Sequence, residues 1–289
     1  MGEERFYFGY GSNLNAVDWR SWCVERGADP TSMKCVGSAW LLDHSMRFHY
    51  HSTGRKGGAA DVMADGKGTA VPGAIFSLSD KGWELMDKKE GHPRCYQRVP
   101  VQVVTLDGRV VDAIMYTVTP EQRKTSLVIP TEMYANLIQE GLLERKLPIG
   151  HLKSSTEKYD SSSRLENVFV YGTLMRGESR WPQLEPWSSG DVDEGRITGR
   201  LYDLGAYPGV RLDENGAVHG ELHRCEDIEN TLETLDLIEG HNVLRPGKGL
   251  YVRVPVSVQT ANGTVWAWTY VINEVPKASR PLQDGRWVP

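Results

Sequence analysis

Two stretches of this chain, EGHPRCYQRVPV at residues 90–101 and EGHNVLRPGKGLYVRVPV at residues 239–256, carry the same motif in the same order. Each has Glu-Gly-His, a short insertion, and then Tyr-x-Arg-Val-Pro-Val. Upstream of each lies a strand-like run that ends in Tyr-Gly-Ser/Thr: FYFGYGS at residues 6–12 and VFVYGT at residues 168–173. A matched order of motifs with unequal loops indicates a duplicated domain.

Further similar segments predict what each copy looks like. VPGAIF at residues 71–76 aligns with VHGELH at 218–223, and AIMY at 113–116 aligns with AWTY at 267–270. All have strand length and composition. Each half is therefore predicted to hold several short strands, with one helix before Glu-Gly-His. Such a pattern is typical of the α+β class, here two tandem small β-barrel domains with flanking helices.

The boundary between the copies can be placed from composition. Residues 130–146 have apolar side chains at helical spacing, which predicts a helix at the end of the first copy. After it, KSSTEKYDSSSR at residues 153–164 is polar and rich in serine, without apolar periodicity. We therefore expect a first domain at residues 1–152, a flexible linker at 153–165 and a second domain at 166–289.

Composition narrows the class of protein. The chain has 289 residues, a net charge of −5, and apolar and charged fractions of 39% and 25%, which are those of a globular protein. The negative charge and the lack of a basic stripe argue against a nucleic-acid partner. No apolar run approaches the ~20 residues that span a bilayer, so no membrane partner is expected. The four scattered cysteines and the lack of a secretory signal at the start predict a cytoplasmic protein.

In both halves a turn after the first strand is paired with a glutamate at a helix end. Glu90 and Glu239 each precede a glycine, where the helix dipole favours a cation over an anion. A solvated carboxylate at the end of a helix remains the simpler reading of either glutamate alone. The turns expose successive backbone N–H groups, which suit an anion or a carbonyl oxygen.

These motifs resemble a known family. The first half is similar to the γ-glutamylcyclotransferases through YGSNL at residues 10–14, the Gly57-Gly58-Ala59 loop, Glu90-Gly91 and the helix that carries Tyr134. The second half is similar to the γ-glutamylamine cyclotransferase and AIG2-like branch, through VFVYGTLMRG at residues 168–177 and Glu239-Gly240.

The resemblance implies a small β-barrel with flanking helices and an enzyme that acts on a small γ-glutamyl compound. In this reaction the α-amine attacks the γ-carbonyl of the same glutamyl group, releasing 5-oxoproline and a free amine. The resemblance makes Glu90 and Glu239 the catalytic carboxylates. It also implies these substrate-binding residues: Tyr7, Phe8, Gly9, Tyr10, Gly11, Ser12, Tyr134, Tyr171, Gly172, Thr173 and Leu174.

This chemistry needs no enzyme nucleophile and no cofactor, because both reacting groups belong to one ligand. The site has to fold the ligand into the attack geometry and move a proton. A carboxylate with the ordinary pKa of about 4.3 is a poor base for an ammonium group. We therefore predict that Glu90 and Glu239 lie in partly apolar pockets, where burial raises their pKa.

Alternatives remain open from the sequence. His219, Glu221, His223 and Cys225 alternate along a predicted strand, as metal ligands can, but two of them align with a proline and a phenylalanine, so no metal is predicted. The protein could be a non-catalytic binding or regulatory protein that keeps the pocket. It could also remove a γ-glutamyl protecting group from a biosynthetic intermediate. Because the second half lacks counterparts of Asn13 and of the Tyr134 helix, we expect the two pockets to differ in substrate.

Overall fold

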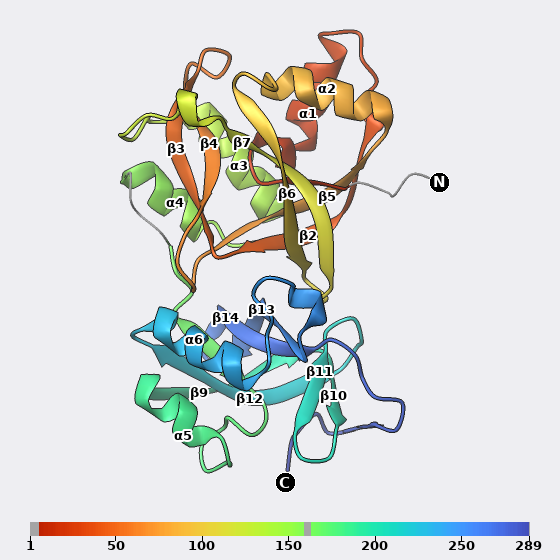
Figure 1. Ribbon diagram of the computed structural model, residues 1–289, viewed down its shortest axis with the longest axis vertical. Helices are drawn as coiled ribbons and strands as arrows, with labels where there is room; N and C mark the ends of the chain where they lie inside the picture. The colour runs from red at the N-terminus through yellow and green to blue at the C-terminus, as the bar shows by residue number, and fades with distance from the viewer. Residues whose placement is uncertain (1–5, 159–162, 289) are drawn as a thin grey trace. The chain divides into compact units, whose positions relative to one another are not determined.

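Hydrogen-bonded strands close into a five-stranded barrel twice in this chain, as the computed structural model shows (Figure 1). The structure describes residues 6–158 and 163–288. The described chain forms two compact units, the first of residues 6–103 and 111–163 and the second of residues 104–110 and 164–288. The α+β fold class and the two tandem barrels with flanking helices are confirmed.

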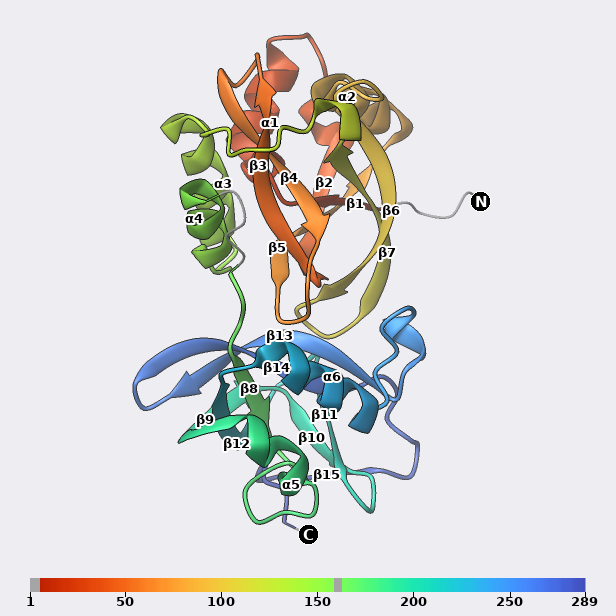
Figure 2. The ribbon, with the colours of Figure 1, turned by 60° about the vertical axis from the view of Figure 1, so that its left-hand side comes forward.

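The first barrel has the cyclic strand order β1-β5-β2-β6-β7. Its strands are β1 (Phe6–Gly9), β2 (Met33–Leu42), β5 (Ala70–Leu78), β6 (Tyr96–Thr105) and β7 (Val110–Val118). Between β2 and β5 the chain forms a separate two-stranded sheet, β3 (His44–Ser52) and β4 (Gly57–Ala64). The helices are α1 (Ala16–Val24), α2 (Asp80–Glu90), α3 (Glu132–Glu144) and α4 (Gly150–Glu157). Figure 2 shows α3 and α4 on the flank of the barrel that also carries β3.

The second barrel repeats this order with β8, β12, β9, β13 and β14 in the places of β1, β5, β2, β6 and β7. These strands are β8 (Asn167–Val170), β9 (Ser188–Thr198), β12 (Ala217–Cys225), β13 (Tyr251–Thr260) and β14 (Gly263–Ile272). A three-stranded sheet is added from β10 (Arg200–Asp203), β11 (Pro208–Arg211) and β15 (Arg280–Pro281). The helices are α5 (Trp181–Leu184) and α6 (Ile228–Ile238).

Strand register shows that the two barrels are copies residue by residue. Phe8 pairs with Ile75 across β1 and β5, and Phe169 pairs with Leu222 across β8 and β12. These pairs are the ones that the sequence alignment of residues 71–76 with 218–223 requires. Both phenylalanines are buried in the barrel interior, at most 1% exposed.

The helix before each Glu-Gly-His begins and ends in the same way. The side chain of Ser79 accepts a hydrogen bond from Gly82 N at the start of α2, and that of Asp227 accepts one from Asn230 N at the start of α6. Such N-caps satisfy backbone N–H groups that have no partner within the helix. Both helices end at a glycine in the left-handed conformation, Gly91 with φ 65° and Gly240 with φ 62°. That conformation is cheap for glycine alone, which is why each glutamate lies where its helix stops.

Two details of the first unit differ from the sequence-based expectations. Residues 150–157 form α4, which occupies the start of the segment predicted to be a flexible linker; Leu152 and Ser155 of this helix are buried. Residues 159–162 of that segment lie outside the described residues. The Gly57-Gly58-Ala59 segment is the start of strand β4 and not a loop. A Cβ on Gly58 would lie 1.9 Å from the Val128 carbonyl oxygen, so a glycine is required by close packing.

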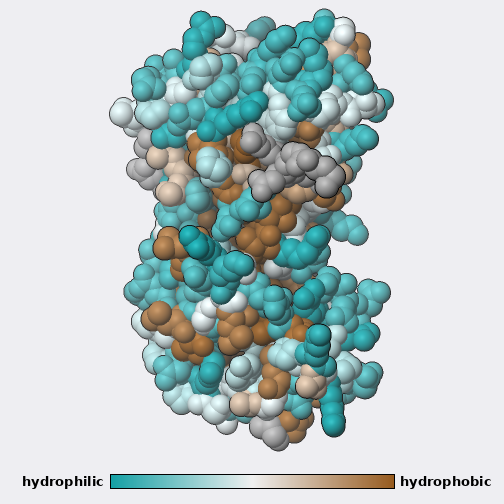
Figure 3. All heavy atoms as spheres, turned by 45° about the vertical axis from the view of Figure 1, so that its right-hand side comes forward, coloured by the Kyte–Doolittle hydropathy of each residue, from teal (hydrophilic) through white to brown (hydrophobic). Residues whose placement is uncertain are grey.

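The surface drawn in Figure 3 is covered mainly by hydrophilic residues, with hydrophobic ones in smaller groups. Among the helices of the described residues, none combines the length and apolarity needed to span a membrane.

Gly73 in β5 and Gly220 in β12 occupy equivalent positions in the two barrels, and Gly73 gives a test of the strand packing. A Cβ on Gly73 would lie 2.4 Å from the Gly9 carbonyl oxygen and 2.6 Å from the Phe8 ring. Gly73→Ala should therefore push β5 away from β1 and lower the free energy of unfolding by about 2 kcal/mol or more. Gly37→Ala in the same barrel is the matched control, because no atom lies within 4 Å of the added methyl group. Equal stability of the two variants in urea denaturation would contradict this packing.

Candidate active sites

The end of α2 brings Glu90 to the turn that follows β1. Asn13, in the short 3₁₀ turn Ser12–Leu14, donates a 2.8 Å hydrogen bond from Nδ2 to Glu90 Oε1 and a 2.9 Å bond to the Tyr7 hydroxyl. Burial raises the pKa of the Glu90 carboxyl group, while the charge of Lys89 and the Asn13 hydrogen bond oppose that rise. The prediction of a partly apolar pocket with a raised pKa is confirmed for this residue.

Glu90 lines a cavity of about 330 Å³, a volume within the range of small-molecule sites. Of the predicted substrate-binding residues of the first half, those that also line it are Tyr7, Tyr10, Gly11, Ser12 and Tyr134. Phe8 and Gly9 are not among its described lining residues; Phe8 is fully buried inside the barrel. Strand alternation explains the position of Phe8, since Tyr7 and Phe8 point to opposite faces of β1.

A charged network forms one wall of this first cavity. The guanidinium of Arg55 donates two hydrogen bonds to the Asp18 carboxylate, 2.8 and 2.7 Å long, and a third of 3.0 Å to Ser12 Oγ. Lys89 Nζ lies 2.9 Å from Asp18 Oδ2. Burial works against ionisation of Asp18, but Arg55 and Lys89 outweigh it and lower the pKa of that carboxyl group. The network leaves a surplus of positive charge beside Glu90.

In both barrels a second cluster of polar side chains lies one helical turn before the glutamate. In the first, Tyr116 donates a 2.7 Å hydrogen bond to Asp87, and the Arg98 guanidinium lies 2.9 Å from the same carboxylate. The equivalents in the second are Tyr270, which donates a 2.8 Å bond to Asp236, and Arg253 at 3.3 Å. These residues join the helix to the Tyr-x-Arg-Val-Pro-Val strand and to the last barrel strand.

The tyrosine of each turn is tied to the last barrel strand as well. Tyr10 donates a 2.5 Å hydrogen bond to the Tyr116 carbonyl oxygen, and Tyr171 donates one of the same length to that of Tyr270. The histidines after the glutamates contact the backbone: His92 Nδ1 lies 3.3 Å from the Tyr96 carbonyl oxygen and His241 Nδ1 3.4 Å from that of Tyr251. Both histidines therefore hold the loop between helix and strand.

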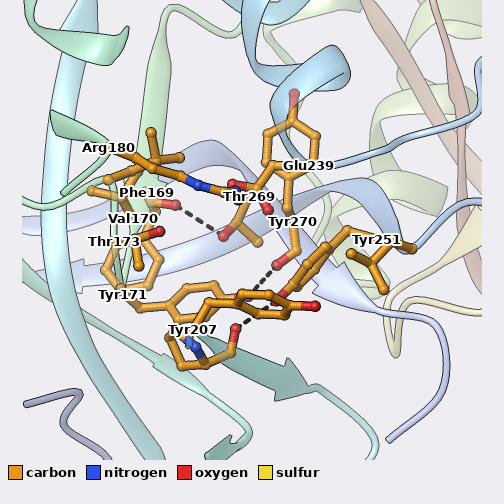
Figure 4. Close-up of a pocket in the computed structure, with 14 residues that line it drawn as sticks. Phe169, Val170, Tyr171, Thr173, Arg180, Tyr207, Glu239, Tyr251, Thr269 and Tyr270 are labelled. Atoms are coloured by element: carbon orange, nitrogen blue, oxygen red, sulfur yellow. Dashed lines mark hydrogen bonds between the residues drawn. The ribbon is translucent and has the colours of Figure 1, made fainter. Parts of the chain in front are cut away.

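The second cavity is smaller, with a volume of about 40 Å³ (Figure 4). The predicted residues Tyr171, Gly172, Thr173 and Leu174 line it together with Glu239. It is completed by residues that the sequence analysis did not assign to the site, Arg180, Tyr207, Tyr251 and Tyr270 among them. The Tyr251 hydroxyl donates a 2.6 Å hydrogen bond to the Pro208 carbonyl oxygen.

Glu239 is 8% exposed. Burial raises the pKa of its carboxyl group to about 7, against the opposing charge of Arg180. In the alignment of the turns, Leu174 takes the place of Asn13, so an apolar side chain stands where the first site has an amide donor. The predicted pocket with a raised pKa is confirmed for this residue too.

The side chains considered as metal ligands have other partners. His223 Nε2 lies 3.1 Å from Glu221 Oε2, and its Nδ1 lies 3.2 Å from Ser188 Oγ. His219 Nδ1 lies 3.3 Å from Arg286 Nη2. In the part of the chain that the structure describes, no three His, Cys, Asp or Glu side chains gather as metal ligands would.

Comparison with known proteins agrees with this architecture. The family model "Gamma-glutamyl cyclotransferase, AIG2-like" matches residues 7–136 and again residues 168–289. The chain therefore belongs to this family, with one copy in each barrel, and the predicted tandem duplication and enzyme class are confirmed at the level of the family.

Individual relatives match over the length of one barrel. A putative gamma-glutamylcyclotransferase of Vibrio cholerae is 34% identical over 125 residues, 42% of this chain and 93% of the relative. The gamma-L-glutamyl-butirosin B gamma-glutamyl cyclotransferase of Niallia circulans is 33% identical over 126 residues, 43% of this chain and 78% of the relative. A solved gamma-glutamyl cyclotransferase structure shares 22% identity and covers 54% of this chain and 88% of its own, with a TM-score of 0.45.

Asn13 of the first turn aligns with Leu174 of the second, so each turn can be given the residue of the other. Asn13→Leu removes a donor that favours the ionised form, so the pKa of Glu90 should rise further. Leu174→Asn should lower the pKa of Glu239 from about 7 in the same way. Titration of the glutamate carboxyl ¹³C signals measures both shifts. If neither pKa moves, the turn residue does not control the carboxylate.

Burial of Glu239 also makes stability depend on pH. Its pKa of about 7 in the folded protein exceeds the ordinary value of 4.5, so the folded state holds the proton more tightly than the unfolded state. The stabilisation is complete below the unfolded pKa and is lost as the pH rises through about 7, a change of about 3 kcal/mol. Glu239→Gln should abolish this fall in urea denaturation from pH 4.5 to 8, whereas Glu233→Gln, on the exposed face of the same helix, should keep it. Parallel profiles of wild type and Glu239→Gln would refute the assignment.

Proposed function

We propose that each barrel cleaves γ-glutamyl amides by intramolecular cyclisation and releases 5-oxoproline with a free amine. The observation that carries the proposal occurs twice: a carboxylate with a raised pKa lines a cavity together with the Tyr-Gly-Ser/Thr turn. A pure binding protein has no need of a buried carboxylate whose ionisation costs stability. The reaction requires no cofactor, because proton transfer, ring closure and loss of the leaving amine are its only steps.

Glu90 and Glu239 act as the bases in this scheme. The carboxylate takes a proton from the α-ammonium group, and the free amine attacks the γ-carbonyl carbon. A C–N bond forms within the new ring, and the oxygen of the tetrahedral intermediate gains negative charge. The original amide C–N bond then breaks as the carboxyl group returns the proton to the leaving amine, and the ring nitrogen releases its second proton to water. A base with a pKa near neutrality suits both directions of proton transfer.

The turn after the first strand supplies the remaining polar contacts. A tight 3₁₀ turn leaves its first backbone N–H groups without partners inside the turn. In the first site these groups belong to the segment Gly11–Asn13, whose residues line the cavity beside Glu90. We assign Tyr7, Tyr10, Gly11, Ser12 and Tyr134 to substrate binding there, and residues 171–174 to the same role in the second site.

A second candidate function concerns the first site alone. Its cavity is much larger than the second one, and one relative acts, by its name, on γ-L-glutamyl-butirosin B. The name of this relative supports the removal of a γ-glutamyl protecting group from a biosynthetic amine, and the larger cavity is the reason for assigning a bulky amine to the first site. The four cysteines are free, which agrees with action in the cytoplasm.

Replacement of each glutamate by glutamine tests the proposal. Gln keeps the shape of the side chain but cannot take up the ammonium proton, so turnover at that site should fall at least ~10²-fold. Because the cavities differ in size, any one γ-glutamyl amide should lose nearly all 5-oxoproline release in one variant and little in the other. Mass spectrometry of the products measures this.

Two other outcomes are informative. If each variant loses about half the activity with the same amide, the pockets are redundant and the assigned difference in substrate is wrong. If neither variant loses activity, the carboxylates are not catalytic, and a binding or regulatory role takes the place of the enzyme.

A further inference from the structure

The second cavity contains a single cationic side chain among its described lining residues, that of Arg180. A γ-glutamyl group carries an α-carboxylate that is ionised at neutral pH. Taking this charge out of water is costly unless a cation or several N–H donors receive it. Arg180 is therefore the residue in this cavity whose chemistry matches the part of the substrate that does not react.

The backbone and side chain of Arg180 are held at the site from two directions. Its backbone N donates a 2.8 Å hydrogen bond to the Thr173 carbonyl oxygen, which ties it to the turn. Its Nη1 donates a 3.3 Å bond to the carbonyl oxygen of Ile238, the residue before Glu239. The guanidinium carbon lies 6.0 Å from the centre of the Tyr207 ring. Figure 4 shows the side chain extending across the cavity toward Glu239.

This guanidinium differs from the arginine of the first site. Arg55 gives both arms of its fork to Asp18. Within the described residues, by contrast, no carboxylate lies within ion-pair distance of Arg180, and the five donors of its fork meet one backbone oxygen in the bonds found. The geometry of a guanidinium fork matches that of a carboxylate.

We propose that Arg180 binds the α-carboxylate of the γ-glutamyl group in the second cavity. The N–H groups of the turn at residues 171–174 are then left for the carbonyl oxygen that gains negative charge. This assignment rests on the proposed function of the second barrel and adds the group that orients its substrate. The residue was missed in the sequence because its first-barrel counterpart position carries no arginine, and the Arg55 that serves the first cavity comes from a hairpin.

A substrate pair that differs only in the carboxylate tests the assignment. In the Glu90→Gln background, which silences the first site, we compare γ-glutamylmethylamide with 4-aminobutyrylmethylamide, which cyclises to 2-pyrrolidinone. Arg180→Met should lower kcat/KM for γ-glutamylmethylamide at least ~20-fold, mainly through KM, and change that for the 4-aminobutyryl compound less than ~3-fold. Arg180→Lys should recover part of the loss, because an ammonium group keeps the charge but not the fork.

Each outcome decides between the readings. An equal loss for both substrates would mean that Arg180 acts on Glu239 or on the fold, and no loss would mean that the carboxylate binds elsewhere; either overturns the proposal. If the Glu90→Gln protein turns over neither amide, the proposed cyclotransferase function of the second barrel is wrong. The role of Arg180 is then tested by ligand binding. In equilibrium dialysis with radiolabelled 5-oxoproline, loss of one bound equivalent on Arg180→Met supports the assignment, and an unchanged stoichiometry overturns it.

Discussion

In both barrels one hydrogen bond joins a tyrosine of the last strand to an aspartate of the helix, Tyr116 to Asp87 at 2.7 Å and Tyr270 to Asp236 at 2.8 Å. The aspartate lies three residues before the glutamate, so it shares a helix face with it. An arginine from the neighbouring strand approaches the same carboxylate. The last turn of the helix is thereby fixed to the barrel. Without this attachment neither glutamate would be held against the turn that follows the first strand.

Each glutamate is an unfavourable group at the place where its helix ends. A carboxylate at a helix C-terminus meets the negative end of the dipole, and burial adds a cost of ionisation. The structure offsets the cost around the carboxylate but does not remove it, since burial still raises the pKa of Glu90 and of Glu239. A base in the proposed reaction needs that residual rise, so stability and the proposed function pull in opposite directions here.

How much of the fold and the sites could be predicted from the sequence depends on how far apart in the chain the interacting residues lie. The duplication, the barrels and both glutamates could be read because they lie in short motifs that occur twice in one order. Asn13 lies inside such a motif, and its bond to Glu90 needed only the knowledge that turn and helix end meet. The contact of Arg55 with Asp18 joins a hairpin loop to a helix 37 positions away, and no local pattern encodes it. The α4 helix was missed because its polar sequence is stabilised by burying Leu152 and Ser155.

The features that the two barrels share have a different role from the segments in which they differ. Register, the glycines at β5 and β12, and the Asp–Tyr–Arg cluster are the same in both, and all of them position the glutamate. The differences lie outside the barrel strands: the β3–β4 hairpin brings Arg55 and α3 brings Tyr134 to the first cavity, whereas the connection between β8 and β9 brings Arg180 to the second. The duplicated core therefore holds each glutamate beside its turn, and the cationic side chains of the two cavities come from segments that differ between the copies.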